Sequence, residues 1–428
     1  MNDTIPNAAA LDALVDARFD DSVAFLRELV RMPSDTPPGD NAGHAEGSAK
    51  LLEALGFTVE RHALPAELVA KRGMKSVTNL VVRHRFGDGP VIALNAHGDV
   101  VPPGEGWTKG PYEGVVDKGR MYGRGVAVSK SDFATYAFAL DALKRAGHAA
   151  GTVELHFTYD EEMGGELGPG WLLAHGISKP DLAIGAGFSY AVVTAHNGAL
   201  HLEVTVRGEA AHAAMPETGV DALRAAVDII QSIYAMRAGF EAIRSRVPGI
   251  GSPTINVGRI EGGINTNVVP DKVRFSLDRR MIPEEDPDAA EKALRETIFR
   301  AQAAHPKVRV DIRRLLLARA LTPLPGHEVL VQALQEEAAR VFGARPPAVG
   351  VPLYTDARLY GEAGIPIVLF GAGPRTILEA NAKRADENLV LDDLRKATKV
   401  IAGALATLLR GSSASPASPS PTRKSAES

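Results

Sequence analysis

Hydrophobic positions in the first half of the chain switch repeatedly between helical and strand periodicity. Residues 7–32 carry apolar side chains at the three- and four-residue spacing of an amphipathic helix, which ends at Pro33. Residues 90–95 are almost continuously apolar, as is typical of a strand buried on both faces. Further helices are expected at 41–55, 131–145 and 166–175, and further strands at 77–86, 152–159 and 181–186. This alternation predicts an α/β sheet with helices on its faces.

A different order begins near His196. The expected elements are a strand at 200–206, a helix at 221–237, two strands at 254–260 and 272–281, a helix that ends at 304, and a strand at 308–313. This is the β-α-β-β-α-β order of the ferredoxin-like fold. The α/β rhythm then resumes, with elements expected at 328–342, 357–362, 366–370 and 389–409.

The pattern therefore predicts two domains. Residues 1–194 and 315–410 together form the first, an α/β domain with a mixed, largely parallel sheet flanked by helices. Residues 195–314 form the second, an inserted ferredoxin-like α+β domain. Residues 411–428 are rich in serine and proline, cannot bury apolar surface, and are expected to be a disordered tail.

Composition narrows the possible functions. The net charge of −4 supplies no broad basic face, so nucleic acid is not an expected partner. The absence of cysteine excludes disulfides, thiolate metal sites and cysteine nucleophiles. No segment has the ~20 consecutive apolar residues of a membrane-spanning helix, and residues 1–18 lack the basic start of a secretory signal. We expect a cytoplasmic protein with no membrane contact.

Two clusters of polar residues directly follow predicted strands. His97-Gly98-Asp99 follows the first buried strand, and Asp160-Glu161-Glu162 follows the strand at 152–159. The carboxyl ends of such strands line the ligand crevice of an open α/β sheet. An aspartate can hold one imidazole nitrogen, and adjacent carboxylates suit a general base and a metal ligand. Taken singly, each cluster is also compatible with an incidental His-x-Asp sequence or a solvated acidic turn.

These clusters belong to a longer series of motifs, between about residues 20 and 410. The series is NAHGDVVP at 95–102, YGRG at 122–125, DEE at 160–162, GEAAHAAMP at 208–216, GGINTNVVP at 262–270, DRRMIP at 278–283, TDAR at 355–358 and GAG at 371–373. In order and spacing it resembles the dinuclear zinc peptidase family that includes acetylornithine deacetylase, succinyl-diaminopimelate desuccinylase, aminoacylase and the glutamate-releasing carboxypeptidases.

The resemblance implies a catalytic domain with an inserted lid domain that usually dimerises, and two divalent metal ions with a glutamate as general base. Glu161 stands at the general-base position, and Asp99 is placed to orient His97. His97 and Glu162 stand at metal-ligand positions. The remaining implied site residues are His212, reaching the oxyanion from the lid, often across a dimer, and the substrate-binding residues Asn267, Arg280, Gly371 and Gly373.

Three other metal-ligand positions of the resemblance carry residues that cannot ligate normally, namely Val128, Gly187 and Lys383. Each metal site would keep one side chain, whereas a catalytic zinc needs about three. Asp132 could replace Val128, although it lies one helical turn away. The cofactor is therefore either zinc or another divalent metal, as the resemblance implies, or none. We expect Lys383 to neutralise Glu162 in place of a metal.

Two functions follow. The first is a hydrolase of an amide or related C–N bond in a small carboxylated molecule resembling an N-acyl amino acid or peptide, acting as a homodimer through the lid. In a metal-free form, His97 becomes an Asp-oriented base, Ser129 and Ser131 are candidate nucleophiles, and a part of Lys130 in catalysis stays open. The second is a non-catalytic protein that binds a small molecule in the retained cleft.

Overall fold

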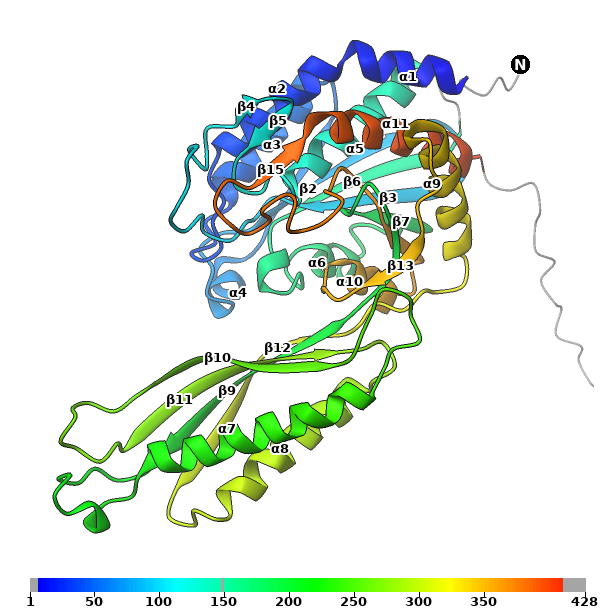
Figure 1. The fold of residues 1–428 in the computed structure, drawn as a ribbon. Helices are drawn as coiled ribbons and strands as arrows, with labels where there is room; N and C mark the ends of the chain where they lie inside the picture. Colours follow the sequence, from blue (N-terminus) through cyan, green and yellow to red (C-terminus); the bar gives the residue numbers. More distant parts are fainter. Residues whose placement is uncertain (1–6, 148–149, 411–428) are drawn as a thin grey trace, which may run out of the picture.

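The main body is built on an eight-stranded sheet (Figure 1). The structure is a computed structural model that describes residues 7–147 and 150–410. In order across the sheet, the strands are β1 (Val59–Ala63), β2 (Thr78–Arg85), β6 (Thr152–Thr158), β3 (Val91–His97), β7 (Leu182–Gly185), β14 (Ile367–Leu369), β8 (Val192–His196) and β13 (Ala348–Val351). The β6/β3, β3/β7, β7/β14 and β8/β13 pairs are parallel, and the other three are antiparallel. The predicted mixed, largely parallel α/β sheet is confirmed.

Helices cover both faces of this sheet (Figure 1). One face carries α1 (Ala8–Ala17), α2 (Phe19–Arg31), α3 (Ala42–Ala54), α5 (Lys130–Arg145), α9 (His327–Phe342) and α11 (Leu391–Leu408). The other carries the short helices α6 (Pro169–Ala174) and α10 (Ala357–Glu362). Helix α5 is buried along almost its whole length, because it lies between strand β3 and helices α2 and α11. This packing fixes the start of α5, which follows directly on a loop of the candidate site.

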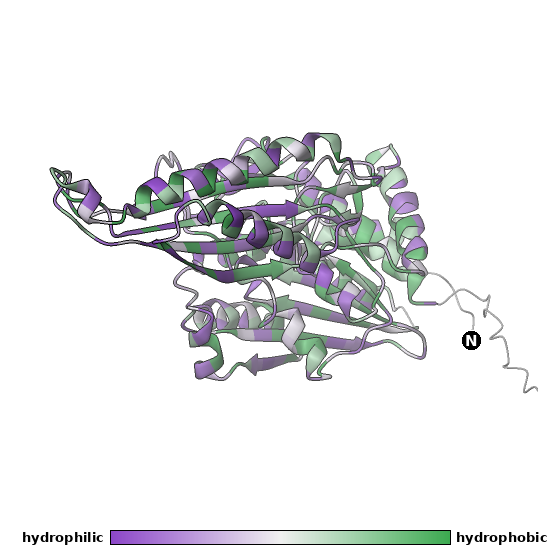
Figure 2. Ribbon diagram, turned by 90° about the horizontal axis from the view of Figure 1, so that it is seen from below, coloured by the Kyte–Doolittle hydropathy of each residue, from purple (hydrophilic) through white to green (hydrophobic). Residues whose placement is uncertain are grey.

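A second sheet of four antiparallel strands projects from the main body (Figure 1). Its strands, in sheet order, are β10 (Thr254–Gly262), β11 (Lys272–Met281), β9 (Gly198–Arg207) and β12 (Arg309–Ala318). Helices α7 (Ala222–Gly239) and α8 (Pro287–Gln302) cover one face and enclose a separate apolar core. Strand β11 alternates strictly between buried and half-buried residues, so one face packs on the helices. Figure 2 shows hydrophilic and hydrophobic positions mixed along these helices, as expected for amphipathic elements.

The element order of this four-stranded unit is the β-α-β-β-α-β order expected from the sequence. Strand β12 continues to Ala318, beyond the predicted end at residue 313, so the expected domain limit between residues 314 and 315 falls inside a strand. The reason is pairing: Leu316, Leu317 and Ala318 continue the ladder with β9 after an irregularity at Arg314. Residues 411–428, where a disordered tail is expected, lie outside the described residues.

Several elements escaped prediction. The expected helix over 7–32 is two helices, which meet at Arg18, where the side chain pairs with Asp21 and Asp141. A short helix α4 (Ala66–Lys71) and a three-stranded sheet of β15 (Asn388–Val390), β5 (Arg120–Tyr122) and β4 (Val115–Asp117) were not expected. Within the part of the chain that the structure describes, no helix is long and apolar enough to cross a bilayer.

Candidate active site

A cavity of about 370 Å³ opens where β3, β6, β7 and β14 end. His97 is the last residue of β3, and Glu161 and Glu162 follow β6. Because β3 and β6 are parallel neighbours, with His97 paired opposite Thr158, the two motifs meet at the same sheet edge. Among the candidate site residues of the sequence, the lining includes His97, Val128, Glu161, Glu162, Gly187, Arg280 and Lys383.

Asp99 anchors both motifs of this cavity. Its side chain is fully buried, with Oδ1 3.4 Å from His97 Nδ1. The same carboxylate accepts hydrogen bonds from the backbone N–H groups of Glu161, at 3.3 Å, and Glu162, at 3.0 Å. The closest partner of His97 Nδ1 is the backbone carbonyl of Asp99, at 2.9 Å. Asp99 thus orients His97 and also caps the 3₁₀ turn Glu161–Met163.

His97 and Glu161 face each other across a short gap. His97 Nε2 lies 3.8 Å from Glu161 Oε2. Burial lowers the pKa of His97, but Glu161, Asp99 and Glu162 outweigh it and raise this pKa to about 10. Burial also raises the pKa of Glu161 to about 7, although His97 opposes the shift. A buried carboxyl with a raised pKa is suited to exchanging a proton with a bound molecule.

Lys383 reaches the other carboxylate of the pair, as the sequence predicts. Its Nζ lies 2.7 Å from Glu162 Oε2. The loop that carries it is fixed on its C-terminal side: Asp386 accepts hydrogen bonds from Thr108, and Glu387 accepts one from the Lys383 backbone at 3.3 Å. The Glu162 side chain is 10% exposed and that of Lys383 63% exposed. The ammonium therefore remains hydrated, and this is not a fully buried ion pair.

The Arg124–Glu387 ion pair supports the same wall and was missed by sequence analysis. The distance between Arg124 Nη1 and Glu387 Oε2 is 2.6 Å, and both side chains are almost fully buried. Glu387 Oε1 also accepts a hydrogen bond from the Ala127 backbone at 3.1 Å. Glu387 therefore ties the loop before α5 to the loop that carries Lys383. The two partners lie 263 residues apart, and no local pattern links them.

The residues in this cavity do not fit a pair of tightly held divalent ions. Within residues 7–147 and 150–410, no group of three or more histidine, aspartate and glutamate side chains is placed to hold a metal. Val128 presents an apolar side chain to the cavity and is 39% exposed. The Lys383 ammonium occupies Glu162, the carboxylate that a cation would need. His97 and Glu162 alone give fewer ligands than a catalytic zinc requires.

Gly187 leaves no room for a ligand side chain. A Cβ added there would lie 2.8 Å from the backbone of Leu369 and Phe370, closer than real Cβ atoms approach. Asp132 does not supply the missing ligand either, because it is fully buried outside the cavity lining. Its Oδ1 accepts a hydrogen bond from Ala372 N at 2.8 Å, and burial raises its pKa to about 7. The option that Asp132 replaces Val128 is therefore not supported by its position.

Ser129, Ser131 and Lys130, the candidates for additional roles, are all buried and lie outside the cavity lining. Ser129 Oγ accepts a hydrogen bond from the His97 backbone at 3.1 Å. Lys130 Nζ donates to two backbone carbonyls of the α2 segment, Leu29 and Met32, and burial lowers its pKa to about 7. These three side chains hold backbone in place, and none is presented to a substrate.

The structure brings Arg280 to the cavity but not the other residues expected to contact substrate. Arg280 lines the wall, held by Asp278 at 2.8 Å. His212 and Asn267 are exposed and do not line the cavity; they lie in the connections β9–α7 and β10–β11, at the end of the four-stranded sheet away from the main body (Figure 1). Gly371 and Gly373 are also absent from the lining.

The two glycines have structural roles instead. A Cβ on Gly371 would lie 1.9 Å from Asp132 Oδ1, and a Cβ on Gly373 would lie 2.4 Å from the Gly187 carbonyl. Gly373 N donates to that carbonyl at 2.9 Å. These positions let the loop after β14 pack closely against neighbouring backbone. Tyr354, by contrast, lines the cavity and has Arg280 5.4 Å from its ring centroid, although sequence analysis did not select it. Its position next to the motif at 355–358 was the available signal.

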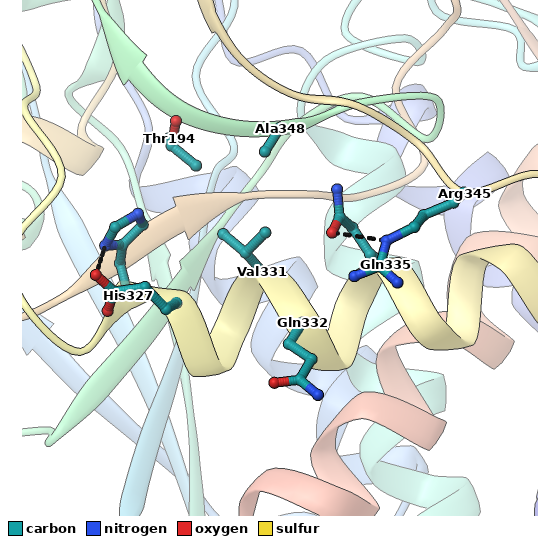
Figure 3. A pocket seen from close by; sticks show the side chains of 8 residues that line it. Thr194, His327, Val331, Gln332, Gln335, Arg345 and Ala348 are labelled. Atoms are coloured by element: carbon teal, nitrogen blue, oxygen red, sulfur yellow. Dashed lines mark hydrogen bonds and ion pairs between the residues drawn. The ribbon is translucent and has the colours of Figure 1, made fainter.

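A second cavity, of about 340 Å³, lies between α9 and strands β8 and β13 (Figure 3). Four of its polar side chains lie in two pairs: Arg345 Nε donates to Gln335 Oε1 at 3.0 Å, and His327 Nδ1 lies 3.4 Å from Glu328 Oε1. It contains none of the residues from the sequence motifs. The cavity at the end of β3 is therefore the stronger candidate for an active site.

Comparison with known proteins agrees with this geometry. Residues 93–407 match the family model described as peptidase family M20/M25/M40. Over 392 residues, the chain is 28% identical to a succinyl-diaminopimelate desuccinylase of Acidiphilium cryptum (strain JF-5), covering 89% of this chain and 96% of the relative. Over 393 residues, it is 29% identical to an acetylornithine deacetylase of Myxococcus xanthus, with 91% and 97% covered.

The fold also has a close match among solved structures. An M20 family metallo-carboxypeptidase from Sulfolobus solfataricus superposes with a TM-score of 0.76 at 18% identity, covering 91% of this chain and all of that one. The family model spans well over half of the chain. The chain therefore belongs to peptidase family M20/M25/M40, whose members are hydrolases of C–N bonds.

Proposed function

We propose that this protein hydrolyses an amide bond in a small carboxylated molecule resembling an N-acyl amino acid or peptide, with Glu161 as the general base. The relatives named above act on such bonds, as their names state. The observation that carries the proposal is the geometry of Glu161: it faces the cavity, 3.8 Å from His97, on a turn that Asp99 fixes. A general base must lie within reach of the water or group whose proton it takes.

In this proposal Glu161, His97 and Arg280 have different parts in the reaction. Glu161 accepts the proton of the attacking water and returns it to the leaving nitrogen. His97, oriented by Asp99, lies beside the carbonyl that is attacked. Arg280 binds the substrate carboxylate, for which a guanidinium is well suited. The proposal includes no step through a metal ion, because the residues present do not fit a tightly bound pair.

We further propose that residues 195–314 act as a lid through which two copies dimerise. The position of His212 and Asn267 supports this, since one chain leaves both exposed and outside its own cavity. A second copy of the chain could place them over the substrate. Gel filtration with light scattering would test the dimer, and a strictly monomeric active enzyme would contradict it.

Glu161→Gln tests the assignment of the base. Glutamine keeps the size of the side chain but cannot accept the proton, so turnover should fall ~10²–10⁴-fold while substrate binding persists. Glu67→Gln, at an exposed position on α4 outside the cavity, is the matched control and should retain full turnover. A Glu161→Gln variant at the wild-type rate removes Glu161 from the mechanism. No turnover of any N-acyl amino acid by the wild type would favour a binding protein.

A further inference from the structure

The cavity walls are mostly apolar, as in many sites that bind small molecules. Aliphatic and aromatic side chains line it on several sides. They include Val128, Phe188, Val351, Leu353, Leu369 and Ile377. The volume of about 370 Å³ lies in the lower part of the range for small-molecule sites, ~300–1,000 Å³. A small ligand with a sizeable apolar part would fill it best.

The charged groups in the cavity neutralise one another. Three carboxylates and three arginine or lysine side chains line it, namely Glu161, Glu162, Glu387, Arg124, Arg280 and Lys383. His97 also lines it and faces Glu161, with 3.8 Å between Nε2 and Oε2. Arg124 is paired with Glu387 at 2.6 Å, and Lys383 with Glu162 at 2.7 Å. Both cations already have a carboxylate partner that balances their charge; the Lys383 ammonium keeps further N–H donors, but it lies beside Glu162 and its side chain is 63% exposed.

Arg280 is the exception. Asp278 occupies its Nε and Nη2, and among the hydrogen bonds of the described residues its Nη1 has no partner. One guanidinium nitrogen thus remains to bind a ligand carboxylate. A second carboxylate on the ligand would lie against Val128, Phe188 or Ile377, or would meet Glu161 and Glu162. Stranding a charge in such surroundings is costly.

We propose that the ligand carries one carboxylate, held by Arg280, and one apolar group of about four to six carbons, held by the walls near Val128, Phe188 and Ile377. This rests on the proposed function, because it takes the cavity as the substrate site. It separates this chain from the desuccinylase relatives, whose succinyl group brings a carboxylate of its own. The apolar group belongs either to the acyl part or to the amine part of the substrate.

The experiment measures binding to the wild-type protein by titration calorimetry. The probes are ketomethylene analogues, in which CH₂ replaces the amide NH and prevents cleavage. The acyl series is N-acetyl-, N-pentanoyl- and N-succinylglycine, and the amine series is N-acetylglycine and N-acetylleucine. Each buried methylene should tighten binding about fourfold, from ~0.8 kcal/mol per CH₂ and 1.4 kcal/mol per tenfold. The pentanoyl analogue should bind about 50-fold tighter than the acetyl analogue and at least 10-fold tighter than the succinyl analogue.

Two neighbouring residues provide a matched pair of variants. Ile377 lines the cavity, whereas Leu378 is 68% exposed and lies outside the lining. Ile377→Lys removes apolar wall and supplies a cation for a second carboxylate, so it should reduce the preference for pentanoyl over succinyl about tenfold, whereas Leu378→Lys, which adds the same charge, should leave it unchanged. A thermal melt of each variant shows whether it has folded.

Each outcome bears on the proposal. If affinity rises with chain length in the acyl series, the apolar group lies on the acyl side of the substrate. If affinity rises only in the amine series, the apolar group lies on the amine side. Flat affinities in both series overturn the proposal, and so does an acyl series in which the succinyl analogue gains as much affinity over the acetyl analogue as the pentanoyl analogue does. If the wild type prefers the apolar analogue yet cleaves no corresponding amide, the hydrolase proposal fails and the apolar ligand stands.

Discussion

The ion pair between Lys383 and Glu162 is the contact most open to measurement. Lys383→Met removes the ammonium but keeps a side chain of similar length. Burial lowers the pKa of Lys383, but Glu162 and Glu161 outweigh it and raise it above the usual value, so the lysine is charged at neutral pH. The substitution therefore removes a true ion pair and leaves the Glu162 carboxylate, 10% exposed, without its partner.

The expected loss of stability depends on how exposed the side chains of the ion pair are. Breaking a fully buried pair from one side costs ~3–5 kcal/mol, whereas an exposed pair contributes ~0.2–1 kcal/mol. Because the Lys383 side chain is 63% exposed and its partner almost buried, we expect a loss of about 1 kcal/mol in the free energy of unfolding. In a protein of this size that corresponds to a fall in Tm of roughly 1–2 °C.

The assay is a thermal melt at low and at high salt. Lys118→Met is the matched control, because Lys118 also has a left-handed backbone (φ 49°, against 62° at Lys383) and forms no ion pair among the described residues. The difference between the variants should shrink in 1 M salt, where the Debye length falls to ~3 Å. Equal melting temperatures of the two variants at low salt would refute the reasoning.

Three further predictions concern the same cavity. Elemental analysis after gel filtration should find well under one zinc, manganese or cobalt per chain, and two retained equivalents would contradict the ligand arguments. Gly187→Ala should lower the free energy of unfolding by ~1–3 kcal/mol in denaturant melts, because the added Cβ would lie 2.8 Å from backbone atoms. Gly43→Ala is the control, because the space around Gly43 is open, and it should not lower stability. Equal stabilities of the two variants would mean that the loop at Gly187 shifts easily. Ser129→Ala should leave turnover within about threefold of the wild-type rate. It should lower the free energy of unfolding by ~1 kcal/mol, because the hydrogen bond from the His97 backbone is lost. Complete inactivation of a folded variant would instead indicate that Ser129 is a nucleophile.

The large sheet was predictable where strands are buried on both faces. The apolar run at the start of β3 stands out in the sequence because helices cover both sides of the sheet, and β6 is recognisable by its alternating Val153, Leu155 and Phe157. Edge strands were harder: β1 is half exposed, and β13 has only four residues. Their pairing with β2 and β8, rather than their own composition, makes them strands.

Those residues of the candidate site whose motif lies at the end of a strand could be predicted from the sequence. His97, Glu161 and Glu162 meet because their strands are parallel neighbours, a consequence of topology that the α/β alternation already implies. The partners that arrive from distant loops were not accessible in this way. The Arg124–Glu387 pair depends on how the loop before β15 folds back, and the packing of Gly371 against Asp132 depends on tertiary contact.

The loop that carries Lys383 is anchored by the residues on its C-terminal side, since Asp386 holds Thr108 and Lys109 and Glu387 holds Arg124 and Ala127. The Lys383 side chain takes no part in these bonds and reaches Glu162 through Nζ. A substitution at position 383 should therefore change the charge beside Glu162, at a modest cost in stability, without moving the loop. A chemical group attached at position 383 would lie beside Glu162, so this position is suited to introducing a new functional group into the cavity.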